Sequence, residues 1–367
     1  MLVRGNNGSY EFIDFRECAP AAASKQNKRC ILPCRQNLEL IATLAQGMYN
    51  NNTNSSIYTG LASGVPGELR GLAHLHQNYG LLPWEQLVMP AVNVARNGFP
   101  VTQDLVRYMA SAIEGIDNFL VDEPTWAIDF APNGTLLGLG DTIYRRRYAD
   151  TLEAIAKSGP DAFYTGPIAQ ATIDTIQSNG GIMTMEDLKN YTVAIRPPAS
   201  IDYRDYKITS GSAPSSGTVA MSAMKIIEGY PTIGEATTLN LSTHLFDEGI
   251  RFAYGQRSEL GDPYFVEGMQ EYEDDMLKEA TAAAVRAKIS PLHTLNVSAY
   301  DPSGFESLVT PGTSAIVTGD VNGMAISLTT TVNLLFGSHI MVPETGVILN
   351  DEMNDFSIVS PAESSTV

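Results

Sequence analysis

The dipeptide Gly312–Thr313 is the place in the sequence where residue types and their order most directly suggest catalysis. A threonine hydroxyl is a weak nucleophile until a base removes its proton, and a free α-amino group, with a pKa of about 7.7 to 8.0, suits that task. A cut between Gly312 and Thr313 would free such an amine. Pro311 stiffens the approach, and Gly312 has no side chain to obstruct attack by the Thr313 hydroxyl on its carbonyl carbon. The segment is compatible with a nucleophile made by self-cleavage, or with an ordinary turn that opens a strand.

Charged side chains near the two ends of the chain admit two interpretations. Glu352 and Asp355 lie three positions apart, so they could cap the turn before Phe356 or bind a ligand. Arg16 lies between Asp14 and Glu17, an arrangement that usually indicates a solvated surface network. The residue types alone leave both interpretations open.

Two segments downstream of Thr313 resemble a known enzyme signature. SLTTTVNLLFGS at 327–338 and TGVILNDEMNDFS at 345–357 are similar to the signature of gamma-glutamyltransferases, and PGTS at 311–314 puts Thr313 where that family has its nucleophile. Similarity continues upstream in RECAPAAA at 16–23, GLASGVPGELRGL at 60–72, APSSGTVAMSAMKIIEGY at 213–230 and RSELGDPYFV at 257–266. It covers nearly all of the chain outside 24–46 and the last ten residues.

The resemblance implies an N-terminal-nucleophile fold, a layered α/β sandwich of the order αββα. Residues 1–312 would be a large subunit and 313–367 the start of a small one, separated by self-cleavage at Gly312–Thr313. Thr313 would attack the γ-amide of glutathione or a related γ-glutamyl compound, release cysteinylglycine, and pass the γ-glutamyl group to water, an amino acid or a dipeptide. No metal or organic cofactor is implied.

The resemblance also assigns roles to single residues, because Thr331, Asn333, Glu352 and Asp355 follow Thr313 at the family's own offsets. Arg16 would grip the substrate's α-carboxylate as a planar fork, while Glu352, Asp355 and Asn333 would receive its α-ammonium. Thr331 would orient the Thr313 amine.

Departures from the family pattern keep rival functions open. The family normally has sequence before Met1 and a long continuation after the 345–357 motif that supplies serines for the substrate carboxylate and glycines for the oxyanion hole, so we expect a chain truncated at both ends. Ala315 stands where the family usually has histidine, a difference whose consequence we cannot derive. One rival is an inactive homologue that only binds. Another is an amidase that deacylates β-lactams, but its acyl group would not need Arg16, Glu352 and Asp355.

Composition limits the partners and the compartment. The net charge of -18, from 41 acidic and 23 basic residues, disfavours nucleic acid. Cys18, Cys30 and Cys34 do not form a credible metal-ligand set. No apolar run could span a membrane and no signal peptide opens the chain. Seven glycosylation sequons favour a secreted glycoprotein, and the resemblance implies an extracellular, vacuolar or plasma-membrane location. The sequons begin at Asn7, Asn51, Asn54, Asn133, Asn190, Asn240 and Asn296.

Sequence patterns predict the elements that position these residues. Residues 9–15 have the aromatic and β-branched character of a buried strand, with Arg16 at its end. The basic segment 24–46 is interpreted as an insertion. Helices are expected from Glu68, over 84–95, after a Thr102 cap, from a Thr184/Asp187 capping box, and over 217–229 and 239–254. Further strands are expected at 206–210, 313–319, 323–333 and 346–349.

Overall fold

The computed structural model describes residues 1–23, 48–49, 52–304 and 313–355. The expected insertion at 24–46 and Gly312 lie outside these residues. Contacts divide the chain into two compact units, each assembled from segments distant in sequence. Unit 1 comprises Met1–Asp14, Ala194–Thr310 and Ala315–Leu328, and unit 2 comprises Phe15–Val193, Pro311–Ser314 and Thr329–Val367.

The centre of unit 1 is a five-stranded sheet with the order β5-β2-β1-β9-β8. β1 lies between two antiparallel neighbours, with Val3 opposite Glu11 of β2 and opposite Ile326 of β9. Val3 and Ile13 are fully buried. The strands are β1 (Leu2–Arg4), β2 (Tyr10–Asp14), β5 (Ala194–Arg196), β8 (Ser314–Gly319) and β9 (Ala325–Thr330).

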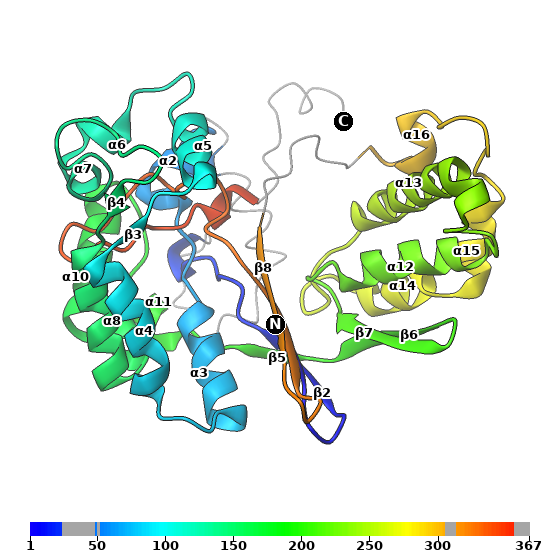
Figure 1. Cartoon of the computed structure of the whole chain (residues 1–367), viewed down its shortest axis with the longest axis horizontal. Helices are drawn as coiled ribbons and strands as arrows, with labels where there is room; N and C mark the ends of the chain where they lie inside the picture. The colour runs from blue at the N-terminus through cyan, green and yellow to red at the C-terminus, as the bar shows by residue number, and fades with distance from the viewer. Residues whose placement is uncertain (24–47, 50–51, 305–312, 356–367) are drawn as a thin grey trace. The chain divides into compact units, whose positions relative to one another are not determined.

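The rest of unit 1 is a helical layer beside the two-stranded hairpin β6–β7 (Figure 1). α12 contacts both strands and also packs against α13, α14 and α15. Its buried face includes Val219 and Ile226, as the apolar pattern predicts. The elements are β6 (Pro198–Tyr203), β7 (Tyr206–Gly211), α12 (Gly217–Glu228), α13 (Leu239–Arg257), α14 (Met269–Met276), α15 (Glu279–Arg286), α16 (Val297–Tyr300) and the 3₁₀ turn η3 (Ala236–Thr238).

Unit 2 is mainly helical, and the most extensive packing between two of its helices is that of α4 (Trp84–Asn97) against α8 (Arg146–Ser158) (Figure 1). Its two largest apolar clusters among the described residues lie around Tyr164 and Leu188 and around Trp126 and Met341. The helices are α2 (Ser55–Tyr58), α3 (Glu68–Tyr79), α4 (Trp84–Asn97), α5 (Gln103–Ala112), α6 (Phe119–Asp122), α7 (Pro124–Phe130), α8 (Arg146–Ser158), α9 (Asp161–Tyr164), α10 (Gly166–Ser178) and α11 (Met185–Asn190). Shorter elements are β3 (Phe99–Pro100), β4 (Thr142–Ile143) and the 3₁₀ turns η1 (Ala21–Ala23), η2 (Gly60–Ala62) and η4 (Glu352–Asp355).

Local sequence rules account for the start of two helices, α5 and α11. Thr102 Oγ1 accepts a hydrogen bond from Leu105 N–H, and Thr184 forms the expected capping box with Asp187. The mixed helix and sheet architecture is confirmed. None of the described helices combines the length and apolar character that a membrane crossing needs.

Two strand predictions are wrong in extent or existence. The strand expected over 323–333 covers only Ala325–Thr330, because Gly323 and Asn333, at its two ends, both have positive φ. Residues 346–349 form no strand beyond an isolated bridge between Met341 and Ile348. The tight turn with Val342 N donating to Val347 O, at 2.8 Å, leaves too few residues for a ladder.

Candidate active site

Thr313 and Thr331 lie at the two open ends of one hairpin. Thr313 directly precedes β8 and is exposed, while Thr331 directly follows β9. β8 and β9 are hydrogen-bonded neighbours, and at their turn Asp320 N donates to Met324 O at 2.9 Å. Continuing this antiparallel register residue by residue sets Thr313 opposite Thr331. The extended register of the hairpin is thus compatible with the prediction that Thr331 orients the amine of Thr313.

The loop after Thr331 is held in a specific conformation. Asn333 has a φ of 72°, which is uncommon for a residue other than glycine. Its N–H donates to Thr331 Oγ1 at 2.8 Å, and its side-chain Nδ2 donates to the carbonyl of Asp351 at 3.1 Å. The Asn333 side chain is buried. In the structure it therefore joins two parts of the site as well as being a candidate ligand for an ammonium group.

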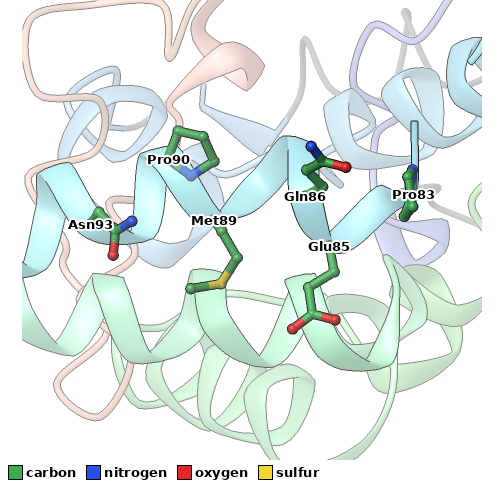
Figure 2. A pocket seen from close by; sticks show the side chains of 6 residues that line it. All are labelled: Pro83, Glu85, Gln86, Met89, Pro90 and Asn93. Carbon is green, nitrogen blue, oxygen red and sulfur yellow. The ribbon is translucent and has the colours of Figure 1, made fainter. Parts of the chain in front are cut away.

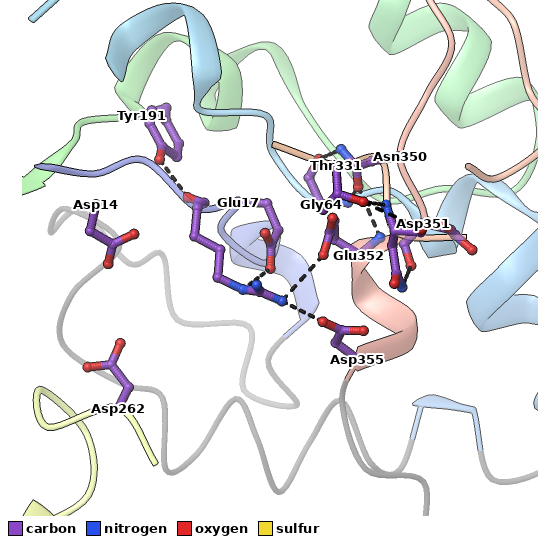
Figure 3. Close-up of polar contacts among 12 residues, drawn as sticks. Asp14, Glu17, Gly64, Tyr191, Asp262, Thr331, Asn350, Asp351, Glu352 and Asp355 are labelled. Atoms are coloured by element: carbon purple, nitrogen blue, oxygen red, sulfur yellow. Dashed lines mark hydrogen bonds and ion pairs between the residues drawn. The ribbon is translucent and has the colours of Figure 1, made fainter. Parts of the chain in front are cut away.

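Arg16, Glu352 and Asp355 meet although more than 330 residues separate the arginine from the two acids (Figure 3). Arg16 Nη2 lies 3.3 Å from Glu352 Oε2 and also contacts Asp355 Oδ2, and Arg16 Nε lies 3.1 Å from Glu17 Oε1. The Arg16 side chain is 46% exposed, and that of Glu352 only 5%. One guanidinium group therefore faces three carboxyl groups in a corner open to solvent on one side.

Backbone contacts fix the position of Arg16. Cys18 forms an antiparallel bridge with Val65, and the Tyr191 hydroxyl donates to the Arg16 carbonyl at 2.6 Å. Gly67 is required where these segments meet, because a Cβ there would lie 2.0 Å from Tyr191 Oη and 2.3 Å from the Phe15 carbonyl oxygen.

Asn350 anchors the segment that carries the two acids (Figure 3). Its side chain accepts a hydrogen bond from Gly64 N and donates one to Gly64 O, both at 2.9 Å. Its Oδ1 also accepts from Glu352 N at 3.2 Å. The 3₁₀ turn η4 then places Glu352 and Asp355 on the side of the turn that Arg16 contacts.

Two acids in this corner, Glu17 and Glu352, hold protons more tightly than usual. Burial raises the pKa of Glu17 to about 7 and that of Glu352 to about 7, against the opposing effect of Arg16. Neighbouring carboxyl groups add to the shift, with Glu352 acting on Glu17 and Asp355 acting on Glu352. The corner has an excess of negative groups over cations, which suits a ligand that brings its own cation.

Sequence reasoning did not assign a role to three residues that build this site. The sequence indicates Glu17 only as a neighbour that balances Arg16, and it indicates no role for Asn350 or Asp351. The adjacency of Glu17 to Arg16 was a usable signal. No sequence signal predicts the burial of Asp351, because the acidic segment in which it lies is typical of a solvated turn.

Surface hollows elsewhere do not compete with this site. Figure 2 shows a hollow along α4, lined by Pro83, Glu85, Gln86, Met89, Pro90 and Asn93. A second lies between α10 and Pro343–Glu344. Neither is lined by a predicted site residue. Among the described residues, no group of His, Cys, Asp and Glu side chains is placed to hold a metal ion.

Solved structures define the class of protein. The fold matches the crystal structure of the Helicobacter pylori gamma-glutamyltranspeptidase with a TM-score of 0.66 and 29% identity, over 81% of this chain and 80% of that one. It also matches a cephalosporin acylase from Bacillus halodurans with a TM-score of 0.74 and 26% identity, over 97% of this chain and 60% of that one. These matches place the fold among the N-terminal-nucleophile hydrolases.

Sequence comparison narrows the class to one family. The gamma-glutamyltranspeptidase family model matches residues 1–367, and the chain belongs to that family. It is 52% identical to a glutathione hydrolase proenzyme of Arthroderma benhamiae over 99% of this chain and 59% of that protein. It is 47% identical to a glutathione hydrolase of Aspergillus flavus over 98% of this chain and 56% of that protein. The chain thus spans less than two thirds of the length of these curated relatives.

Proposed function

We propose that this chain carries the γ-glutamyl-binding and nucleophile-bearing part of an enzyme that hydrolyses glutathione and related γ-glutamyl compounds or transfers their γ-glutamyl group. The observation that carries the proposal is the meeting of Arg16 with Glu352 and Asp355. The names of the fungal relatives support the same substrate class.

The charges in this corner match the head of a γ-glutamyl group. An α-carboxylate can pair with the planar fork of Arg16. An α-ammonium can pair with Glu352 and Asp355, both of which contact Arg16 in the structure. Binding would exchange the contacts between Arg16 and the acids for contacts of each with the substrate, so little charge would be left unpaired.

The chemistry assigned to Thr313 begins with its own activation. The Thr313 hydroxyl attacks the Gly312 carbonyl carbon, the peptide bond is replaced by an ester, and water hydrolyses the ester to leave a free Thr313 amine. Residues 1–312 and 313–367 would then form the large/small subunit pair.

In turnover the Thr313 amine takes the hydroxyl proton while Oγ1 attacks the γ-carbonyl carbon of glutathione. The carbon–nitrogen bond breaks, the leaving nitrogen accepts that proton, and cysteinylglycine departs. Water, an amino acid or a dipeptide then attacks the γ-glutamyl ester and regenerates Thr313. Thr331, opposite Thr313 in the hairpin register, would hydrogen-bond the amine and orient it, and Asn333 would complete the ammonium site.

A secretory route would suit this function, with an extracellular, vacuolar or plasma-membrane destination. Every glycosylation sequon asparagine in the described residues is exposed, so N-linked glycans would project into solvent. These are Asn7, Asn54, Asn133, Asn190, Asn240 and Asn296, and Asn51 lies outside the described residues.

Incubation of the full chain with glutathione tests the proposal, with cysteinylglycine and glutamate measured as products and a Thr313→Ala variant as control. We expect product from the parent chain only. Equal rates in both chains would refute the role of Thr313. Tight glutathione binding without product from either chain would indicate the binding-only alternative.

A further inference from the structure

Asp351 joins the two segments that carry the proposed site residues. Its backbone N–H donates to the Val332 carbonyl at 3.2 Å, and its carbonyl accepts from Asn333 Nδ2 at 3.1 Å. Its side-chain Oδ1 accepts from Leu334 N–H at 3.0 Å. These three bonds connect the loop of Thr331 and Asn333 to the segment of Glu352 and Asp355.

The second carboxyl oxygen of Asp351 is an unusual feature. Asp351 is fully buried, and no described residue places a donor within hydrogen-bonding distance of Oδ2. A buried carboxylate oxygen without a donor is costly, whereas a neutral carboxyl group in the same place is far less so. The neutral form still offers Oδ1 to Leu334 N–H, so the brace does not require a charge.

The surroundings of Asp351 also oppose its ionisation. Asp355, on the turn that follows, carries the charge that opposes ionisation of Asp351, and Asp351 in turn raises the pKa of Glu352. Arg16 contacts Glu17, Glu352 and Asp355. The cation of Arg16 is already shared among three other carboxyl groups. Burial raises the pKa of Asp351 to about 7, with a further contribution from Asp355.

We propose that Asp351 is a positioning residue that works as a neutral carboxyl group, equivalent in shape to an amide, and that its ionisation loosens the 331–334 loop and weakens γ-glutamyl binding. The proposal rests on the proposed function for the identity of the ligand, and on the three hydrogen bonds for the brace itself. Asp351 touches neither substrate nor nucleophile in this scheme.

The pH dependence follows from this arrangement. Below neutral pH the Asp351 carboxyl keeps its proton and the brace is intact. As pH rises through about 7, the carboxylate forms and either stays buried without a donor or turns toward water, and both disturb the Leu334 contact. An Asp351→Asn variant keeps an Oδ1 acceptor and cannot ionise, so its brace should persist at alkaline pH.

Binding of L-glutamate tests the proposal, with all chains carrying Thr313→Ala so that cleavage and turnover play no part. Parent, Asp351→Asn and Asp351→Leu chains are compared by calorimetry at about pH 6 and about pH 8.5. We expect Asp351→Asn to bind like the parent at the lower pH and about tenfold more tightly than the parent at the higher pH. Asp351→Leu, which lacks an acceptor for Leu334 N–H, should bind about tenfold more weakly at both.

The opposite sign would overturn the proposal. If the Asp351 charge attracted the ligand's ammonium directly, Asp351→Asn would bind more weakly than the parent at the higher pH. A constant ratio across pH would also contradict it.

The Leu334 amide resonance separates failure of this proposal from failure of the proposed function. A pH-dependent shift near neutrality in the parent that Asp351→Asn abolishes would support the brace even if no chain bound glutamate. Its absence in both would refute the brace.

Discussion

Two arginines, one in each unit, show how differently a guanidinium group can be used. The Arg196 side chain is 7% exposed. It donates from Nη1 and Nη2 to the two oxygens of Asp262 at 2.7 Å, and from Nε to Asp14 Oδ2 at 2.6 Å. Its guanidinium also stacks over the Tyr264 ring at 4.2 Å. Arg16 is 46% exposed, and it contacts one oxygen of each of Glu17, Glu352 and Asp355.

The contrast separates a structural clamp from a binding corner. A buried guanidinium whose fork is filled has no capacity left for a ligand. A half-exposed guanidinium with single contacts to three acids can exchange those contacts for a substrate carboxylate. Replacing Arg196 should therefore affect stability more than ligand binding, whereas replacing Arg16 should affect ligand binding more than stability.

The largest effect is expected for Arg196→Met. Removing the cation takes the Arg196 charge away from two largely buried carboxylates, Asp14 and Asp262, which should lower the unfolding free energy by about 3 kcal/mol or more. Arg16→Met should change it by less than about 1 kcal/mol, because the Arg16 ion pairs are partly exposed. Urea denaturation of both variants measures the difference. Equal losses of unfolding free energy in the two variants would contradict the distinction between a structural role for Arg196 and a binding role for Arg16.

A second large effect is expected where Arg16 is positioned. Gly67→Ala would place a Cβ 2.0 Å from Tyr191 Oη and should destabilise the chain by about 1 to 3 kcal/mol. Gly138→Ala is a matched control, because the nearest atom to its Cβ is Asp141 Oδ2 at 3.7 Å. Thermal unfolding compares the two. A neutral Gly67→Ala would show that the contact between Tyr191 and Arg16 is not needed.

Arg16→Lys tests the planar hydrogen-bonding geometry of the guanidinium group separately from its positive charge. Lysine keeps the cation but cannot pair both oxygens of a substrate carboxylate in one plane. We expect glutathione to bind about 10- to 100-fold more weakly, with stability changed by less than about 1 kcal/mol. Calorimetry measures the affinity. Unchanged affinity would mean that the carboxylate is held elsewhere.

The smallest effect is expected from the pH dependence of Glu17. Its pKa rises on folding from 4.5 to about 7, so between these pH values the folded chain binds more protons than the unfolded chain does. Its contribution to the unfolding free energy is therefore full below about pH 4.5 and is lost as pH rises to about 7. Glu17→Gln should therefore gain stability relative to the parent as pH rises through this window, because glutamine cannot ionise. Urea midpoints at several pH values measure this gain, and a pH-independent difference would contradict it.

Local sequence patterns predict secondary-structure elements well, but they predict contacts between residues distant in sequence poorly. The Thr184/Asp187 capping box and the Thr102 cap could be predicted because cap and helix are adjacent in sequence. The pairing of β8 with β9 follows from one short turn. The absent strand at 346–349 could not be predicted, because apolar alternation does not reveal that Gly346 has positive φ within a tight turn.

The candidate site shows the same limit. Without the family resemblance, Arg16 would remain a surface charge, since nothing near it in sequence indicates Glu352 or Asp355 as partners. The burial of Asp351 depends on tertiary contacts with the 332–334 loop that local composition does not encode. The family resemblance predicts the candidate site residues, whereas the hydrogen bonds that connect their segments could be identified only from the structure.

Intact-mass measurement of the purified 367-residue chain, beside a Thr313→Ala variant, tests the central claim most directly. If Thr313 is an N-terminal nucleophile, the parent separates into fragments 1–312 and 313–367, and the variant remains whole. A single uncut mass from folded parent protein, or cleavage of parent and variant alike, would contradict the account.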